Sequence, residues 1–135
     1  MATNNYLLDT HCLIWFQENN PKIPERIMRI MQNPQNKIFF SQVSLFEIAI
    51  KQKIGKLPAF TIDVSDIYEQ AVKDNFTFLP LHNRHLYSYD KVPLKEEHRD
   101  PFDRLLIATA LEDSLVVLSV DKNFSLYTDL VLVEW

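Results

Sequence analysis

Residues 98–113 read HRDPFDRLLIATALED and place two aspartates directly in front of an apolar helix. Asp100 followed by Pro101 is typical of a helix N-cap with proline at the first helical position. Asp103 falls in the first turn, where a negative charge complements the helix dipole. Capping accounts for both acids when this stretch is taken alone. The rest of the sequence shows whether they do more.

The composition is that of one globular domain. The chain has 135 residues, of which 47% are hydrophobic and 24% are charged, a balance typical of folded soluble proteins. We therefore expect a single domain over residues 1–135. The single cysteine, Cys12, excludes an intramolecular disulfide, and no paired Cys/His spacing of a structural zinc site is present.

The N-terminus and the charge balance exclude several classes of function. MATNNY carries no Lys or Arg, and the apolar residues after it are interrupted by Asp9 and His11. We therefore expect no signal peptide, no membrane span and a cytoplasmic location. The single glycine, Gly55, excludes glycine-rich phosphate loops. A net charge of −4 argues against nucleic-acid binding by bulk electrostatics, unless metal neutralises clustered carboxylates.

Apolar runs alternate with helical spacings along the chain. The runs predict strands buried on both faces, at Tyr6–Leu8, Lys37–Phe40, Phe76–Leu79, Leu115–Ser119 and Val131–Val133. Between them, apolar residues recur with the spacing of a helix, which predicts helices at Thr10–Gln17, Pro24–Gln32, Ser44–Lys53, Ser65–Asp74 and Pro101–Glu112. This order predicts an α/β fold, a three-layer sandwich around a mostly parallel central sheet of about five strands.

Acidic residues follow three of these strands. Asp9 comes directly after the first strand, and Asp121 comes just after the fourth. Glu47 lies three residues after Ser44, in the spacing of a capping box. Each acid has a local explanation, but a parallel sheet brings the carboxyl ends of its strands to one edge. Oxygen ligands gathered there would suit Mg²⁺ or Mn²⁺. The acids expected to share this crevice are Asp9, Glu47, Asp103 and Asp121.

Basic residues flank these acids. Arg99 and Arg104 lie next to the two aspartates of the opening stretch, and Lys122 follows the last acid. Lys51 lies one helical turn after Glu47 and could pair with it. Together with neighbouring lysines it could instead hold a phosphate backbone, or simply end a solvated helix.

Four segments resemble the signature blocks of the PIN-domain family, most closely the VapC-like ribonuclease toxins of toxin–antitoxin pairs. They are LLDTHCLIW (7–15), SQVSLFEIAIK (41–51), HRDPFDRLLIATA (98–110) and LSVDKNF (118–124). Their order and spacing cover nearly the whole chain. The resemblance implies a PIN-like fold and a Mg²⁺- or Mn²⁺-dependent endoribonuclease that a cognate antitoxin silences and that forms a homodimer.

The resemblance also implies roles for individual residues. It assigns catalysis and metal binding to Asp9, Glu47, Asp103 and Asp121. Thr10 and Ser119 match small hydroxyl positions beside the first and last acids. We expect Ser44 and Asp100 to support the ligands as capping neighbours. Phosphate contacts with RNA are expected from Arg99, Arg104, Lys51 and Lys122.

Two other functions stay open on the sequence. A Mg²⁺-dependent phosphatase with an aspartyl nucleophile would want a second acid two residues after Asp9, where the chain has His11. A non-catalytic PIN-like module could instead use the fold to bind RNA or protein. Metal binding that requires Asp9 would favour the enzyme.

Overall fold

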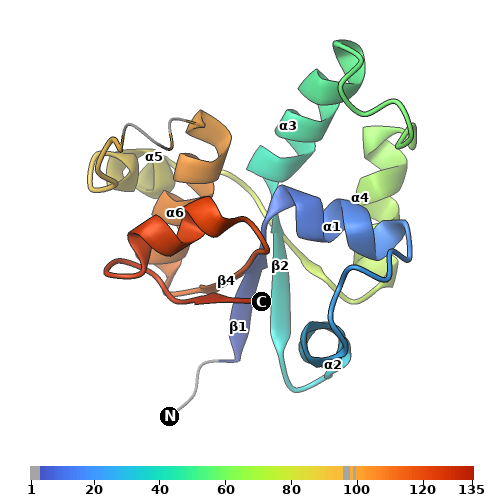
Figure 1. Ribbon diagram of the computed structural model, residues 1–135, viewed down its shortest axis with the longest axis horizontal. Helices are drawn as coiled ribbons and strands as arrows, with labels where there is room; N and C mark the ends of the chain where they lie inside the picture. The colour runs from blue at the N-terminus through green and yellow to red at the C-terminus, as the bar shows by residue number, and fades with distance from the viewer. Residues whose placement is uncertain (1–3, 96–97, 99) are drawn as a thin grey trace.

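A five-stranded parallel sheet forms the centre of the protein in a computed structural model that describes residues 4–95, 98 and 100–135. Its strands are Asn5–Leu8 (β1), Lys37–Ser41 (β2), Thr77–Leu79 (β3), Val116–Leu118 (β4) and Val133–Glu134 (β5). Their order in the sheet is β3-β2-β1-β4-β5, and every neighbouring pair is parallel. The first strand of the chain thus lies in the middle of the sheet (Figure 1).

Helices cover both faces of this sheet. They are Thr10–Gln17 (α1), Glu25–Gln32 (α2), Gln42–Lys53 (α3), Val64–Lys73 (α4), Asn83–Tyr89 (α5), Pro101–Asp113 (α6) and the 3₁₀ helix Lys122–Tyr127 (η1). Helices α1, α2 and α4 pack on one face, and α6 and η1 pack on the other (Figure 1). Within the described ranges, no helix combines the length and apolarity needed to cross a bilayer.

The sheet separates two hydrophobic cores because successive side chains of a strand point to opposite faces. In β1, Leu8 packs into the core that contains Ile27 and Ile67, whereas Leu7 packs into the core that contains Leu106. All five are completely buried, and burying a leucine or isoleucine side chain contributes about 1.5–3 kcal/mol. The absence of polar alternation in the sequence of the strand follows from this double burial.

The structure confirms the predicted α/β sandwich, and element boundaries differ by one or two residues. Helix α3 begins at Gln42, because Ser41 is its N-cap and accepts the Val43 N–H at 2.9 Å. Ser44 and Glu47 therefore do not form the capping box that their spacing allowed as an alternative. Helix α5 and η1 had no predicted bounds, since each is too short to show a clear helical period.

The connections around β1 create the crevice in which the acids lie. From β1 the chain continues to β2 and β3 on one side, and then crosses to β4 and β5 on the other. Such a switch point opens a crevice at the carboxyl ends of the strands. Asp9 follows β1, and its N–H donates to the Leu118 carbonyl of β4 at 3.1 Å. Asp121 follows β4 close to the same point.

Candidate metal centre

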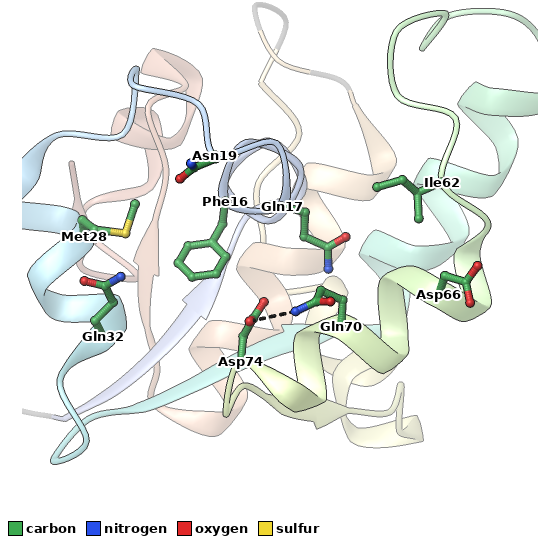
Figure 2. Close-up of a pocket in the computed structure, with 9 residues that line it drawn as sticks. All are labelled: Phe16, Gln17, Asn19, Met28, Gln32, Ile62, Asp66, Gln70 and Asp74. Carbon is green, nitrogen blue, oxygen red and sulfur yellow. Dashed lines mark hydrogen bonds between the residues drawn. The ribbon is translucent and has the colours of Figure 1, made fainter.

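Two hollows of the surface do not contain the predicted acids. A pocket of about 370 Å³ lies between α1, α2 and α4, and among its lining side chains Gln70 Nε2 donates to Asp74 Oδ1 at 3.0 Å (Figure 2). An apolar groove of about 470 Å³ lies between the starts of α3 and α6, with Phe46 and Phe102 among its lining residues. The acids instead lie at the carboxyl edge of the sheet, beside the apolar groove.

Asp9 is buried where β1 meets α1, and both of its carboxylate oxygens are hydrogen-bonded. As the N-cap of α1 it accepts the Cys12 N–H on Oδ1 at 2.7 Å, and Oδ2 accepts the hydroxyl of Ser119. Burial raises the pKa of Asp9 from 3.8 to about 6; these two hydrogen bonds lower it, and the charges of Asp121 and Glu47 raise it. Capping therefore uses only one oxygen, and the other ties β1 to the end of β4.

Glu47 projects from α3 into the crevice and is 2% exposed. Its Oε1 accepts the Thr10 hydroxyl at 2.6 Å, and Thr10 Oγ1 lies 3.0 Å from the Ser44 hydroxyl. Its Oε2 accepts a hydrogen bond from the Lys51 ammonium at 2.6 Å. Ser44 thus reaches the carboxylate through Thr10, and it has no capping role in α3.

Asp100 and Asp103 occupy the start of α6. Asp100 is the N-cap, and its Oδ1 accepts the N–H groups of Phe102 at 2.8 Å and Asp103 at 3.2 Å. Asp103 Oδ2 lies 3.1 Å from His98 Nε2. Burial raises the pKa of Asp103 from 3.8 to about 7; the His98 contact lowers it, and the charges of Asp100 and Glu47 raise it.

Asp121 caps η1 and shares a partner with Asp9. Its Oδ1 accepts the Asn123 N–H at 2.9 Å, and its own N–H donates to Ser119 Oγ at 3.0 Å. Ser119 in turn donates its hydroxyl proton to Asp9. One serine therefore joins the two acids that follow the neighbouring strands β1 and β4.

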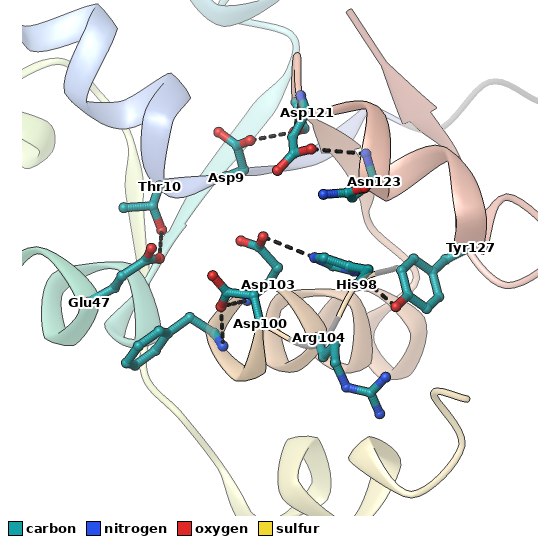
Figure 3. A network of polar contacts seen from close by, with 12 residues as sticks. Asp9, Thr10, Glu47, His98, Asp100, Asp103, Arg104, Asp121, Asn123 and Tyr127 are labelled. Carbon is teal, nitrogen blue, oxygen red and sulfur yellow. Dashed lines mark hydrogen bonds and ion pairs between the residues drawn. The ribbon is translucent and has the colours of Figure 1, made fainter. Parts of the chain in front are cut away.

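The acids face one another across the crevice (Figure 3). One carboxylate oxygen each of Glu47, Asp100 and Asp103 lies within 4.8 Å of the others. Because Mg²⁺ holds oxygens at about 2.0–2.1 Å, ligands on opposite sides of the ion are about 4 Å apart. Small side-chain movements would let these three oxygens share one ion. Among the described residues, Asp100, predicted only as a neighbour of the ligands, thus belongs with Glu47 and Asp103 to a group that could hold an ion.

The cations predicted to contact phosphate occupy different positions. Lys51 pairs with Glu47, and its side chain is 29% exposed. Lys122 is exposed at the start of η1, beside the last acid. Arg99 lies outside the described residues. The two described lysines therefore border the carboxylate group.

Arg104 does not contact the crevice, which corrects its predicted role. Its side chain is buried, and it donates to the carbonyls of Val92 at 2.9 Å and Pro93 at 2.6 Å and to the Tyr89 hydroxyl at 3.2 Å. A helix turns by about 100° per residue, so a residue adjacent to Asp103 points in another direction. Arg104 holds the loop before α6 and is unavailable to phosphate.

His98 belongs to the site, although the sequence reasoning assigned it no role. It is 4% exposed, with Nε2 at Asp103 and Nδ1 2.9 Å from the Tyr127 hydroxyl. Its one sequence signal is its place in the opening stretch, two residues before Asp100. The contact with Tyr127, 29 positions along the chain, has no local signature.

The fold and these side chains define an α/β protein with a candidate divalent-metal centre at the carboxyl edge of its sheet. The family model of the PIN domain matches residues 6–130. The chain belongs to the PIN domain family, and this confirms the resemblance seen in the sequence. A comparison with curated proteins gives no match.

Several solved structures share the fold. VapBC2 from Rickettsia felis, bound to a DNA fragment from its promoter, has a TM-score of 0.69 and 12% identity over 96% of both chains. VapBC-1 from nontypeable Haemophilus influenzae has a TM-score of 0.65 and 23% identity over 96% of both chains. VapBC-5 from Mycobacterium tuberculosis, a member of the VapBC family of toxin-antitoxin systems, has a TM-score of 0.56 and 20% identity, over 96% of this chain and 94% of that chain. This likeness shows the fold.

The two raised carboxyl pKa values predict how the stability of metal-free protein depends on pH. Asp9 at about 6 and Asp103 at about 7 lie above the unfolded value of 3.8. Between these values the folded protein binds more protons than the unfolded chain, so the stability these groups contribute at low pH is lost as pH rises through the folded pKa. In EDTA, Asp9→Asn should therefore exceed the wild type in unfolding free energy above about pH 6 and match it near pH 4.

Urea unfolding of both proteins between about pH 4 and pH 8, with and without Mg²⁺, measures this difference. Mg²⁺ should stabilise the wild type and have little effect on Asp9→Asn, because the variant lacks a charged ligand. A difference in unfolding free energy between Asp9→Asn and the wild type that stays constant across the pH range would contradict the raised pKa of Asp9.

Substitution of Asp100 separates capping from metal binding. Asparagine keeps an oxygen acceptor for the helix N–H groups, so Asp100→Asn should leave the unfolding free energy of metal-free protein nearly unchanged, whereas Asp100→Ala should lower it by about 1 kcal/mol. Both variants lose a negative charge and should bind Mn²⁺ more weakly in a calorimetric titration. If Asp100→Asn binds Mn²⁺ as tightly as the wild type, Asp100 caps the helix and does not bind the metal.

Proposed function

We propose that the protein is a Mg²⁺- or Mn²⁺-dependent endoribonuclease, the toxin of a toxin–antitoxin pair, formed by one PIN-like domain over residues 1–135. The observation that carries this proposal is the carboxylate group at the edge of the sheet. Glu47, Asp100 and Asp103 lie within 4.8 Å of one another, with Asp9 and Asp121 facing them. Membership of the PIN family supports the proposal, and so does the likeness to VapBC structures.

In this proposal the chain supplies a set of carboxylates that are already held in place. The ligands are Asp9, Glu47, Asp103 and Asp121, with Asp100 beside them. Hydroxyl or backbone N–H donors hold the carboxylates of Asp9, Glu47 and Asp121. When bound, a divalent cation lowers the pKa of a water ligand and stabilises the charge that develops in phosphoryl transfer. Side chains oriented beforehand need little reorganisation to take up the ion.

RNA is the proposed substrate, and the cations at the crevice are its proposed phosphate contacts. Clustered acids repel a phosphate backbone until metal neutralises them, so RNA binding should depend on the divalent ion. The contacts are assigned to Lys51 and Lys122, and Arg99, which lies outside the described residues, stays a proposed third contact. Arg104 is withdrawn because its guanidinium is buried against carbonyls. In this proposal, RNA cleavage therefore requires both the carboxylates and these basic residues.

A cognate antitoxin is the proposed inhibitor. One structural neighbour is described as a member of a family of toxin-antitoxin systems. The crevice offers an inhibitor several carboxylates, and the planar guanidinium of arginine matches a carboxylate in a bidentate fork. An antitoxin segment carrying arginine or lysine would compete with metal for the same oxygens.

A homodimer in the cytoplasm is the proposed form of the toxin. The apolar groove beside the site includes Phe46, which is 61% exposed. The centroid of the Phe46 ring lies 5.9 Å from that of the Phe102 ring. Exposed apolar surface next to a polar site is typical of protein interfaces. A second copy seated there would bring two carboxylate groups near one another.

Substitution of the acids tests the nuclease proposal. Because the ligands act as one unit, Asp9→Asn, Glu47→Gln and Asp103→Asn should each abolish nearly all cleavage of total cellular RNA, and the losses should not add. Asp121→Asn should cost less, because Asp121 is only half-buried, whereas Asp9 is buried. Asp66→Asn, at an exposed acid of α4 that lines a different pocket, is the matched control and should cleave like the wild type.

Cleavage is measured with Mn²⁺ and with EDTA, and folding is checked by circular dichroism. Near wild-type cleavage by Glu47→Gln would contradict the assignment of this residue. RNA binding that persists in EDTA, without cleavage by any variant or by the wild type, would instead identify a non-catalytic binding module.

Co-expression with the neighbouring small open reading frame tests the partner. Its product should co-purify with the protein, stop RNA cleavage and carry Arg or Lys in the segment that enters the crevice. Asp9→Asn should weaken the complex, because a carboxylate that pairs with this segment has lost its charge. If RNA is still cleaved at the full rate in the presence of the product of the neighbouring open reading frame, that product is not the antitoxin.

A further inference from the structure

A buried chain of side chains leads from Arg104 to the carboxylate of Asp103. Arg104 donates to two backbone carbonyls and the Tyr89 hydroxyl, and, against the lowering effect of burial, the Tyr127 side chain raises its pKa. The Tyr127 hydroxyl lies 2.9 Å from His98 Nδ1, and His98 Nε2 lies 3.1 Å from Asp103 Oδ2 (Figure 3). The side chains of this relay all come from residues that are buried or half-buried.

One placement of the protons gives each contact of this chain a donor and an acceptor. Arginine has donors and no acceptor, so the Arg104 guanidinium can only donate toward the Tyr127 oxygen. In this placement the Tyr127 hydroxyl donates its proton to His98 Nδ1. The ring proton of His98 then lies on Nε2, where it is donated to Asp103 Oδ2.

We propose that His98 is a positioning residue for the candidate metal centre, held by Arg104 and Tyr127 in the tautomer whose Nε2–H orients the Asp103 carboxylate. This rests on the proposed metal-dependent function. With Oδ2 engaged by His98, the other Asp103 oxygen points toward the side of the crevice that carries Glu47 (Figure 3). Arg104 thus serves the site from behind instead of contacting phosphate.

Packing keeps the His98 ring in place. It lies against Tyr127 and Phe124, with ring centroids 5.5 and 6.2 Å away, and both aromatic residues are fully buried in η1. Hydrogen-bonded partners outside the ligands themselves typically change metal affinity about 10–100-fold when removed. His98 has the burial and the fixed orientation that such a partner requires.

A second buried histidine provides a matched control. His85 Nδ1 accepts the His82 backbone N–H at 3.0 Å, and its Nε2 lies 2.9 Å from Asp113 Oδ2. It therefore has the same tautomer and the same kind of carboxylate partner as His98. Asp113 is outside the carboxylate group of the crevice and pairs with Arg84. Substitution of His85 disturbs the fold in a similar way without reaching the candidate metal centre.

Two substitutions of His98 separate the effect of its contact with Asp103 from that of its contact with Tyr127. The amide nitrogen of glutamine can replace Nε2, so His98→Gln keeps the donor to Asp103. Asparagine is shorter and reaches only toward the position of Nδ1, so His98→Asn keeps a polar group at Tyr127 and loses the donor. Calorimetric titration with Mn²⁺ should show affinity about 10–100-fold weaker in His98→Asn and close to the wild type in His98→Gln and His85→Asn.

The tautomer is measured independently in the metal-free protein by ¹⁵N NMR of the histidine rings. His98 should show protonated Nε2 and unprotonated Nδ1, with His85 as the internal reference, and Tyr127→Phe should change this pattern at His98 alone. A protonated Nδ1 in wild-type His98 would overturn the proposed relay. Equal Mn²⁺ affinity of wild type and His98→Asn would overturn the positioning role while metal binding stands. Failure of the wild type to bind Mn²⁺ at all would instead overturn the proposed function.

Discussion

Backbone N–H groups at the starts of helical segments hold three of the carboxylates in the crevice. Asp9, Asp100 and Asp121 are the N-caps of α1, α6 and η1. Each cap is locally favourable, since a carboxylate satisfies free N–H groups and complements the helix dipole. The parallel sheet then assembles these caps at one edge, where their charges repel. Capping and metal binding are therefore two uses of the same residues, because the cap occupies only one carboxylate oxygen of each acid.

The sequence was sufficient for the fold and for the neighbourhood of the site. Strands buried on both faces lack polar alternation, so β1, β2 and β4 are visible as apolar runs, and an acid directly after a strand marks the carboxyl edge. Asp9 and Asp121 are at the edge where parallel topology predicts them. These features depend on composition over a few residues and on the handedness of crossovers, which are general properties of α/β proteins.

The directions of side chains and their long-range partners could not be predicted from the sequence. Arg104 is adjacent to Asp103, yet one helical step turns it toward Val92 and Pro93, which are carbonyl acceptors in a loop without a sequence signal. Ser44 has capping-box spacing, but Ser41 caps α3 because the helix begins earlier. His98 acquires its place through Tyr127, a contact that exists only after η1 packs against α6. Each of these outcomes is decided by tertiary packing, which overrides local propensity.

The bond between Ser119 and Asp9 spans 110 positions of the chain, and this separation matters during synthesis. A ribosome releases Asp9 and Glu47 well before β4, so the nascent chain carries these acids for most of its translation without the strand that pairs with the other side of β1. The crevice closes only when Ser119 and Asp121 emerge. Under the proposed function, the carboxylates of Asp9 and Asp121 come together only after β4 has been made.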